Sequence, residues 1–160
     1  MSTTSSIRNQ EKNQLCFNVR LDWLEKKRSL ITSDEVKDSI RVATPVPFGG
    51  EGKEWSPEHL YVSAIAGCFM NTYLYFAGKL GFETSHFICE ARGKIALSKG
   101  RYVFTRIDLY PKIFIANEAF RAKAQQALTK SVSNSLVVNS SKAVINCRAE
   151  ILLDLHPKFV

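Results

Sequence analysis

The chain has 160 residues, of which 45% are hydrophobic and 23% are charged, and its formal net charge is +7. These values are ordinary for a globular protein and predict a single domain, residues 1–160, with a buried core. Four cysteines occur without any C-x-x-C or Cys/His pairing, which argues against a zinc site and against a disulfide scaffold. We therefore expect no metal, no cofactor and a cytoplasmic location.

The positive charge is scattered along the chain, with one short basic run at residues 26–28. Such a run is more typical of a solvated turn than of a nucleic-acid site, although a basic nucleic-acid-binding module stays a third interpretation. Residues 1–13 are polar and lack the apolar segment of a secretory signal, so we expect a mobile tail there.

Six strands are predicted by alternating polar and apolar residues, which place one face of each strand against a core. In chain order they cover residues 15–23, 29–33, 38–46, 86–98, 101–115 and 143–155. The strands arrive mostly as hairpins, one of them turning at Lys99 and Gly100. We therefore expect antiparallel sheets in an α+β fold.

A long helix is predicted over residues 55–81, following a glycine-rich loop that lacks phosphate-binding spacing. Ser56 is a preferred N-cap, Pro57 suits the first helical position, and Glu58 lies in the first turn, where the helix dipole favours negative charge. Gly81 is the expected left-handed residue after the last turn. These signals fix both ends of the helix.

The interior of this helix is apolar on almost every face, and Cys68 lies near its middle. It is too short and too rich in small polar residues for a comfortable membrane span. A helix that is apolar all round must be buried all round, yet about six strands and two small helices cannot cover it completely. We therefore expect an obligate homodimer with a large apolar interface, and no membrane partner.

After the hairpin, Asn117 is expected to cap a second helix. The inner face of that helix should carry Ala119, Phe120, Ala124, Ala127 and Leu128. Residues 131–140 then form a helical turn or a separate short helix.

Two strings in the chain resemble the motifs of the OsmC/Ohr family. PFGGEGKEWSPEHLYVSAIAGCF, residues 47–69, matches a glycine-rich loop, an N-P-E-x-L helix start and an A-x-x-x-C-F core. AQQALTKSVSNSLVV, residues 124–138, resembles the second motif, C-P-x-S-x-x-L. The resemblance implies an intertwined homodimer with two long helices at its centre. It also implies thiol-dependent reduction of organic hydroperoxides or hydrogen peroxide.

Carried over by residue, the resemblance makes Cys68 the peroxidatic cysteine. It makes Glu58 the glutamate of N-P-E, with Ser56 in place of the asparagine. Arg28 is the better match for the family's arginine, and Arg20 is the alternative.

The resolving cysteine of the family is replaced by Lys130. We therefore expect an external thiol to resolve the sulfenic acid of Cys68, and we expect Lys130→Cys to improve dithiol-driven turnover. Cys16, Cys89 and Cys147 fall in predicted strands and are interpreted as packing residues.

Cys68 must be a thiolate to act as a nucleophile. It lies too far along its helix for the N-terminal dipole to help, and apolar surroundings alone would raise its pKa. We therefore expect an imported cation, either Arg28 or Lys130. Glu58 lies ten residues away, roughly 15 Å along the helix, so Glu58 and the arginine should come from the partner subunit. This reasoning predicts two composite sites per dimer.

The apolar tail of an organic peroxide is expected to contact aromatic side chains. The expected pocket residues are Phe48, Trp55, Phe69 and Tyr73. The alternative is a non-catalytic relative that binds an apolar small molecule at the dimer interface or senses oxidation through Cys68.

Overall fold

The structure, a computed structural model, describes residues 15–155. The tail expected at residues 1–13 lies outside this part of the chain. The chain forms two compact units, Met1–Pro57 and Glu58–Val160. That residues 1–160 act as one domain stays a prediction.

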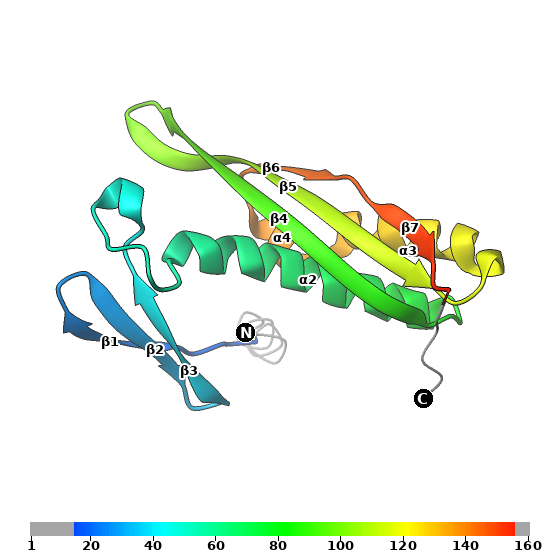
Figure 1. Cartoon of the computed structure of the whole chain (residues 1–160), viewed down its shortest axis with the longest axis horizontal. Coiled ribbons are helices and arrows are strands. Elements are labelled where there is room, and N and C mark those ends of the chain that lie inside the picture. Colours follow the sequence, from blue (N-terminus) through cyan, green and yellow to red (C-terminus); the bar gives the residue numbers. More distant parts are fainter. Residues whose placement is uncertain (1–14, 156–160) are drawn as a thin grey trace, which may run out of the picture. The chain divides into compact units, whose positions relative to one another are not determined.

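The first unit contains a three-stranded antiparallel sheet, drawn in blue to cyan in Figure 1. Its strands are β1 (Arg20–Glu25), β2 (Arg28–Ser33) and β3 (Val36–Ala43). The first strand begins later than the pattern at residues 15–23 predicts. Arg20 pairs with Thr32, one residue before β2 ends, so residues 15–18 run past the end of β2.

The glycine-rich loop follows β3 and contains the short 3-10 helix η1 (Val46–Phe48). The loop returns to its start, because the Ala43 N–H donates a hydrogen bond to the Trp55 carbonyl oxygen at 2.8 Å. Gly50 passes so close to Thr44 that a Cβ atom there would lie 1.5 Å from the Thr44 carbonyl oxygen. Only glycine fits at that point of the loop.

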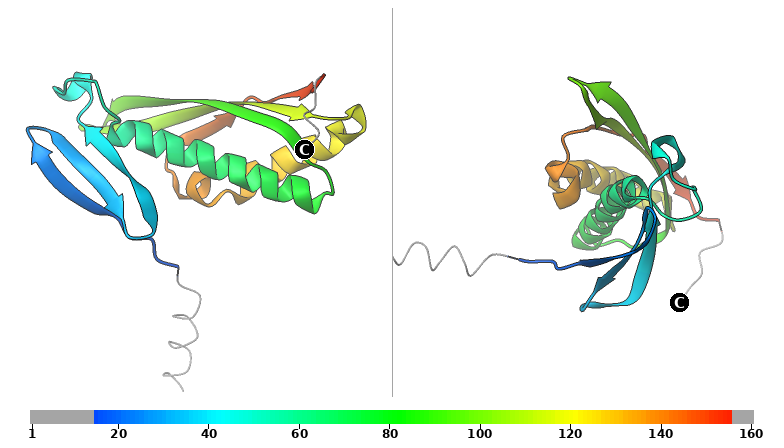
Figure 2. Two further views of the ribbon diagram at one scale, coloured as in Figure 1. Left: turned by 60° about the horizontal axis from the view of Figure 1, so that its bottom comes forward. Right: turned by 90° about the vertical axis from the view of Figure 1, so that its left-hand side faces the viewer.

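The second unit is a sheet with helices on one face. A long antiparallel hairpin, β4 (Thr84–Ser98) and β5 (Arg101–Ile115), forms most of the sheet. The helices α2 (Pro57–Lys79), α3 (Arg121–Asn134) and α4 (Leu136–Ser140) lie on the same side of it (Figures 1 and 2). Asn117 caps the short 3-10 helix η2 (Glu118–Phe120), accepting a hydrogen bond from the Ala119 N–H at 2.9 Å. The predicted second helix therefore starts with a 3-10 turn.

The predicted last strand, residues 143–155, is divided into β6 (Val144–Cys147) and β7 (Glu150–Leu153). Both pair with β5, and both pairings are parallel, unlike the antiparallel pairing expected from hairpins. The chain reaches this edge through α3 and α4, and such a crossover returns a strand in the parallel direction. The hairpin pairs β1–β2, β2–β3 and β4–β5 are antiparallel, as expected.

One stripe of α2 supplies the centre of the core. Ile65, Phe69, Tyr73 and Ala77 recur every four residues and are at most 2% exposed. They pack with the inward side chains of β5 and with α3. The packed residues are Ile107, Leu109, Ile113, Ile115, Ala124 and Ala127.

The rest of α2 is less buried than its composition suggests. In the single chain, Leu74 is 41% exposed and Tyr75 is 59% exposed, so the expectation of burial on all sides is not met there. With a mean hydropathy of 1.2, α2 also has the length and composition of a membrane span, but its buried stripe packs in the core of the second unit. The homodimer and the absence of a membrane partner stay predictions.

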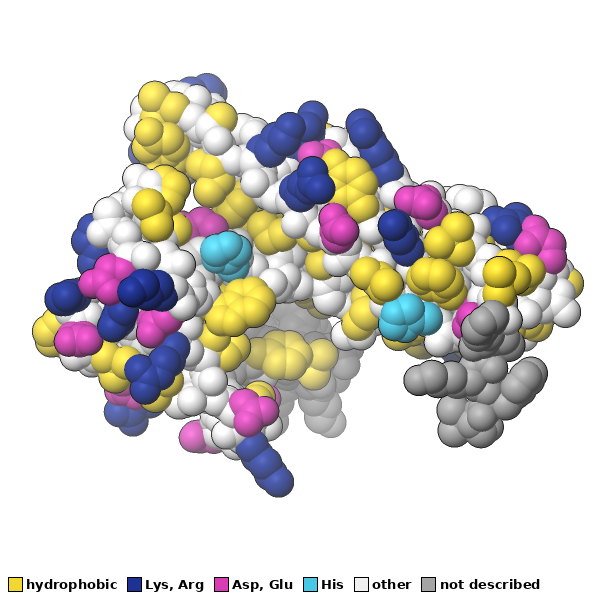
Figure 3. Space-filling view, viewed as in Figure 1, with side chains coloured by type: hydrophobic (Ala, Val, Ile, Leu, Met, Phe, Trp, Pro, Cys, Tyr) yellow, Lys and Arg dark blue, Asp and Glu magenta, His cyan; other side chains and the backbone are white. Residues whose placement is uncertain are grey.

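The opposite face of the sheet carries charged side chains of both signs beside apolar ones (Figure 3). Arg92 lies 3.6 Å from Glu90 and is placed over the ring of Tyr110. This mixture is typical of a solvated sheet face, and it leaves the helix-covered face as the core side.

Candidate functional site

Cys68 lies on α2, and its sulfur meets the start of α4. The Ser135 hydroxyl donates a hydrogen bond to Sγ at 3.2 Å, and the Val137 N–H donates one at 3.5 Å. Ser135 has an extended backbone, which ends α3 and begins α4. The first N–H groups of any helix have no partner within it, and those of α4 are therefore available. The break between the two helices therefore directs hydrogen-bond donors at the sulfur.

These donors determine the acidity of the Cys68 thiol. Burial is the largest single influence and acts to raise the pKa, but the combined hydrogen bonds from Ser135, Val137, Thr72 and Leu136 outweigh it. The pKa of Cys68 therefore lies below that of an ordinary thiol. Ser135 and Val137 carry most of this effect, because the Thr72 hydroxyl has one proton and donates it to the Cys68 carbonyl oxygen at 2.7 Å.

An open hollow of about 760 Å³ lies beside Cys68. It is lined by Cys68, Asn71, Thr72, Tyr75, Phe76 and Asn134. Phe69 and Tyr73, which we expected here, are instead fully buried in the core. Successive residues of a helix point about 100° apart, so their stripe faces the sheet when Cys68 faces the hollow.

The other two expected pocket residues belong to the first unit. Phe48 is 39% exposed and Trp55 is 54% exposed. Their contact with a substrate stays a prediction.

Lys130 lies on α3, with its ammonium nitrogen 5.5 Å from the ring centroid of Phe76 in the hollow. The groups that lower the pKa of Cys68 are neutral hydroxyl and N–H donors. Among the described residues of the single chain, neutral donors alone lower this pKa, and the expected imported cation stays a prediction. That Lys130 stabilises the thiolate stays a prediction.

Glu58 lines a different cavity of about 430 Å³, between the start of α2 and β4. The lining residues are Glu58, His59, Val62, Ser63, Ala66, Cys89, Ala91, Gly93, Ile95 and Phe104. Its Oε2 atom is buried and accepts no hydrogen bond from the described part of the chain. Glu58 and Cys68 of one chain therefore line separate cavities, as their spacing predicts.

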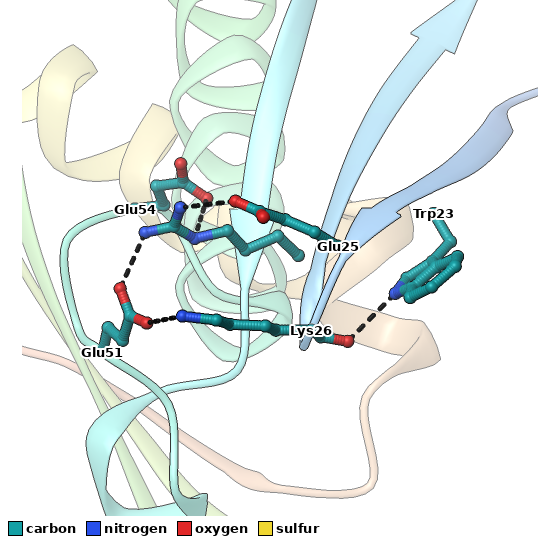
Figure 4. Close-up of polar contacts among 6 residues, drawn as sticks. Trp23, Glu25, Lys26, Glu51 and Glu54 are labelled. Atoms are coloured by element: carbon teal, nitrogen blue, oxygen red, sulfur yellow. Dashed lines mark hydrogen bonds and ion pairs between the residues drawn. The ribbon is translucent and has the colours of Figure 1, made fainter.

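Arg28 lies at the start of β2 and contacts three carboxylates of the first unit, those of Glu25, Glu51 and Glu54. Figure 4 labels these three glutamates. Its guanidinium nitrogens are 2.9 Å from Glu51, 3.4 Å from Glu25 and 3.9 Å from Glu54. These contacts fix the position of a side chain that is only 27% exposed. The role of Arg28 at Cys68 stays a prediction.

Arg20, the alternative arginine, pairs with Asp22, two residues further along β1, at 2.8 Å. With 77% of its side chain exposed, it lacks the carboxylate cluster that holds Arg28. Which of the two arginines serves Cys68 stays a prediction.

The remaining cysteines differ from Cys68. Cys16 is exposed and lies before β1, so the prediction that it packs in a strand is wrong. Burial is the main cause that raises the pKa of Cys89 and that of Cys147, the latter to about 11. Within residues 15–155, no three His, Cys, Asp or Glu side chains gather as metal ligands would.

Sequence reasoning missed the groups that contact Cys68 and Arg28. Ser135 directly precedes the apolar residues 136–138, and a serine in that position signals the start of a helix. Glu51 and Glu54 lie in the glycine-rich loop, where their charge could have been matched with the basic run at residues 26–28. No local signal links either pair of segments.

Known proteins share this fold. The OsmC-like protein family matches residues 50–150, more than half of the chain. An uncharacterized protein of Bacillus subtilis, YmaD, is 18% identical over 142 residues, covering 87% of this chain and 95% of its own. An OsmC-like protein of unknown function from Vibrio cholerae superposes with a TM-score of 0.78 at 15% identity, covering 86% of this chain and all of that one. An organic hydroperoxide resistance protein from Elizabethkingia anophelis superposes with a TM-score of 0.67 at 15% identity, covering 88% and 99% of the two chains. The chain belongs to the OsmC-like protein family.

Proposed function

We propose that this protein is a thiol-dependent peroxidase that reduces organic hydroperoxides through Cys68. The observation that carries the proposal is the Cys68 sulfur itself, which meets an open hollow and accepts hydrogen bonds from Ser135 and Val137. A thiolate is the reactive form of cysteine, and these donors favour it. Similarity to organic hydroperoxide resistance proteins supports the same chemistry.

The reaction begins when the Cys68 thiolate attacks one oxygen of the peroxide. The O–O bond breaks, the alkoxide leaves and takes up a proton as an alcohol, and Cys68 becomes a sulfenic acid. An external thiol attacks the sulfenic sulfur, giving a mixed disulfide and water. A second thiol then displaces Cys68 and leaves as the disulfide. An external thiol is needed because Lys130 occupies the place of a resolving cysteine.

A homodimer would complete the site. The Oε2 atom of Glu58 is buried without a donor among residues 15–155 of its own chain, and such an atom is costly unless a donor reaches it. We infer that an arginine, Arg28 in preference to Arg20, meets Glu58 and the peroxide oxygens in a site that combines residues of both subunits. Dissociation of the dimer would then abolish activity.

Peroxide consumption tests this function. Cumene hydroperoxide is supplied to wild type and to Cys68→Ser at neutral pH, with either a monothiol or a dithiol as reductant. Thiol-dependent consumption by wild type alone, with a sulfenic acid on Cys68 by mass spectrometry, is the expected result. If wild type consumes no peroxide and Cys68 stays unmodified, the proposal fails.

The alternative is a non-catalytic protein that binds an apolar small molecule or senses oxidation. The 430 Å³ cavity favours it, because Val62, Ala66 and Phe104 give it an apolar wall. A copurifying ligand together with a Cys68 pKa at or above the ordinary value would support this alternative.

A further inference from the structure

Two aromatic side chains line the hollow beside Cys68, and a lysine lies over each. The ammonium nitrogen of Lys130 is 5.5 Å from the ring centroid of Phe76, and that of Lys79 is 5.6 Å from the ring centroid of Tyr75. The two rings also pack edge to face, with their centroids 5.3 Å apart. The two cations therefore flank one continuous aromatic wall of the hollow.

Neither lysine is neutralised by a carboxylate in the part of the chain that the structure describes. Other cations of this chain are neutralised: Lys26 pairs with Glu51 at 3.3 Å, and Arg28 pairs with the same residue at 2.9 Å. An ammonium group over an aromatic ring gains some stability but keeps its full charge. Two positive charges without a carboxylate partner among the described residues therefore lie over the aromatic rings that line the Cys68 hollow.

We propose that Lys79 and Lys130 determine specificity at this site, by selecting reactants that carry a carboxylate. The apolar part of such a molecule lies on Tyr75 and Phe76, and its carboxylate faces the two ammonium groups. The inference rests on the proposed function in taking Cys68 as the reacting group. The carboxylate belongs to the hydroperoxide or to the external thiol, since both approach the same sulfur.

Alkylation of Cys68 tests charge selection without any peroxide. Iodoacetate and iodoacetamide are similar in size and differ by one negative charge, and both lose iodide when the thiolate attacks. The measured quantity is the ratio of their rates at Cys68, from peptide mass spectrometry at low salt. This ratio cancels the thiolate fraction, so a change in the pKa of Cys68 does not affect it.

We expect Lys79→Met and Lys130→Met each to lower the iodoacetate-to-iodoacetamide ratio about two- to threefold, and the double variant to lower it further. Methionine keeps an unbranched apolar side chain over the ring. Added salt should reduce the wild-type ratio toward that of the double variant. An unchanged ratio in the double variant would overturn the proposal.

Lys123→Met is the matched control. Lys123 lies on the same helix as Lys130, with its ammonium nitrogen 6.0 Å from the ring centroid of Phe120, which does not line the hollow. Its removal changes the net charge by the same unit, so it should leave the ratio unchanged. A decrease equal to that of Lys130→Met would mean that overall charge, and not the position of the lysine, sets the ratio, and would also overturn the proposal.

Two matched pairs of reactants identify the source of the carboxylate. One pair is a hydroperoxide with a terminal carboxylate and its methyl ester, and the other is 3-mercaptopropionate and 2-mercaptoethanol acting on a Cys68 mixed disulfide. In one of the two pairs, the lysine variants should lower the reaction rate of the carboxylate-bearing reactant more than that of its neutral partner. Equal slowing within both pairs contradicts the proposal. If wild type consumes no peroxide but the alkylation ratio responds, the proposed function fails and the charge selection stands.

Discussion

Cys68 and Cys147 are both partly buried in the second unit, yet the pKa of Cys68 is lowered and that of Cys147 is raised. At Cys68, burial would raise the pKa, but hydrogen bonds from Ser135, Val137 and two further donors lower it overall. At Cys147, burial acts with little opposition, and the nearby Cys89 adds to it, so that the pKa rises to about 11. Cys147 is the more deeply buried thiol and lacks the donors that Cys68 has, so depth and hydrogen bonds together separate the two thiols.

The secondary structure around each sulfur explains the difference in hydrogen-bond donors. Cys147 lies in β6, opposite Leu109 of β5, where backbone N–H groups bond to the neighbouring strand. Cys68 faces the start of α4, where the first N–H groups have no partner within the helix. A sheet thus gives its cysteine few donors, whereas a helix start offers several.

The largest expected effect is loss of activity in Cys68→Ser. We expect thiol-dependent peroxide consumption to fall roughly 100-fold or more, because serine is a poor nucleophile at neutral pH. Cys147→Ala should keep nearly full activity, since its thiol stays protonated. Initial rates of hydroperoxide loss compare the two variants. Equal losses in both would show that the two sulfurs do not differ as their surroundings indicate.

The pH dependence of alkylation is the second test. At pH 8, a thiol with a pKa of about 11 is ionised in about one molecule in a thousand, whereas Cys68 is ionised more than an ordinary thiol. The more basic thiolate is intrinsically more nucleophilic, which reduces the contrast in rate. We therefore expect Cys68 to react with iodoacetamide about tenfold or more faster than Cys147.

The direction in which each pKa is shifted determines the pH at which the alkylation rate of that cysteine levels off. The rate at Cys68 should level off below the pH at which an ordinary cysteine does, because its pKa is lowered. The rate at Cys147 should keep rising up to about pH 11. Peptide mass spectrometry separates the two sites, and parallel profiles would contradict the comparison.

Local signals made much of the fold predictable. The proline at residue 57 and the glycine at residue 81 bracket α2, and Gly81 does adopt the left-handed conformation, with a φ of 72°. The strand predicted at residues 101–115 has the same bounds as β5. The errors in the predicted strands arise because pairing between strands depends on residues that are far apart in the sequence. Residues 15–18 alternate like a strand but lie beyond the end of β2.

The site was predictable only in part, for the same reason. Cys68 was identified through the motif around it, which is contiguous in sequence. Ser135, which donates to its sulfur, is 67 residues away, and neither periodicity nor spacing joins the two. Considered on α2 alone, Cys68 needed a cation. The start of α4 supplies neutral donors to its sulfur.

Ser135→Ala would weaken the contrast between the two thiols by removing one donor. The pKa of Cys68 should rise, and its alkylation rate at pH 7 should fall about two- to tenfold, since hydrogen bonds to charged groups are strong. Ser133→Ala is the control, because that hydroxyl donates to the Thr129 carbonyl oxygen on the exposed side of α3. A pH profile of Cys68 alkylation measures both. If the profile does not move, the backbone N–H groups alone hold the thiolate.

The smallest effect is expected from Lys130→Cys, which places a second thiol near the acidic one. Lys130 lies one turn before Asn134, which lines the hollow with Cys68. After one equivalent of hydroperoxide, we expect a disulfide between Cys68 and the introduced cysteine, and dithiol-driven turnover about two- to fivefold above wild type. Non-reducing peptide mass spectrometry detects the bond.

Lys123→Cys, two turns earlier on α3, tests whether proximity to Cys68 is what matters in this variant. A thiol there lies beside Phe120 and not beside the hollow, so no bond to Cys68 should form. A disulfide requires Cα atoms within about 4.4–6.8 Å. If the Lys130→Cys thiol also remains unpaired while Cys68 is oxidised, residue 130 does not occupy the resolving position, and the match of residues 124–138 to the second family motif is wrong. Cys68 would then still be the more acidic thiol, because its donors come from Ser135 and Val137 and not from residue 130.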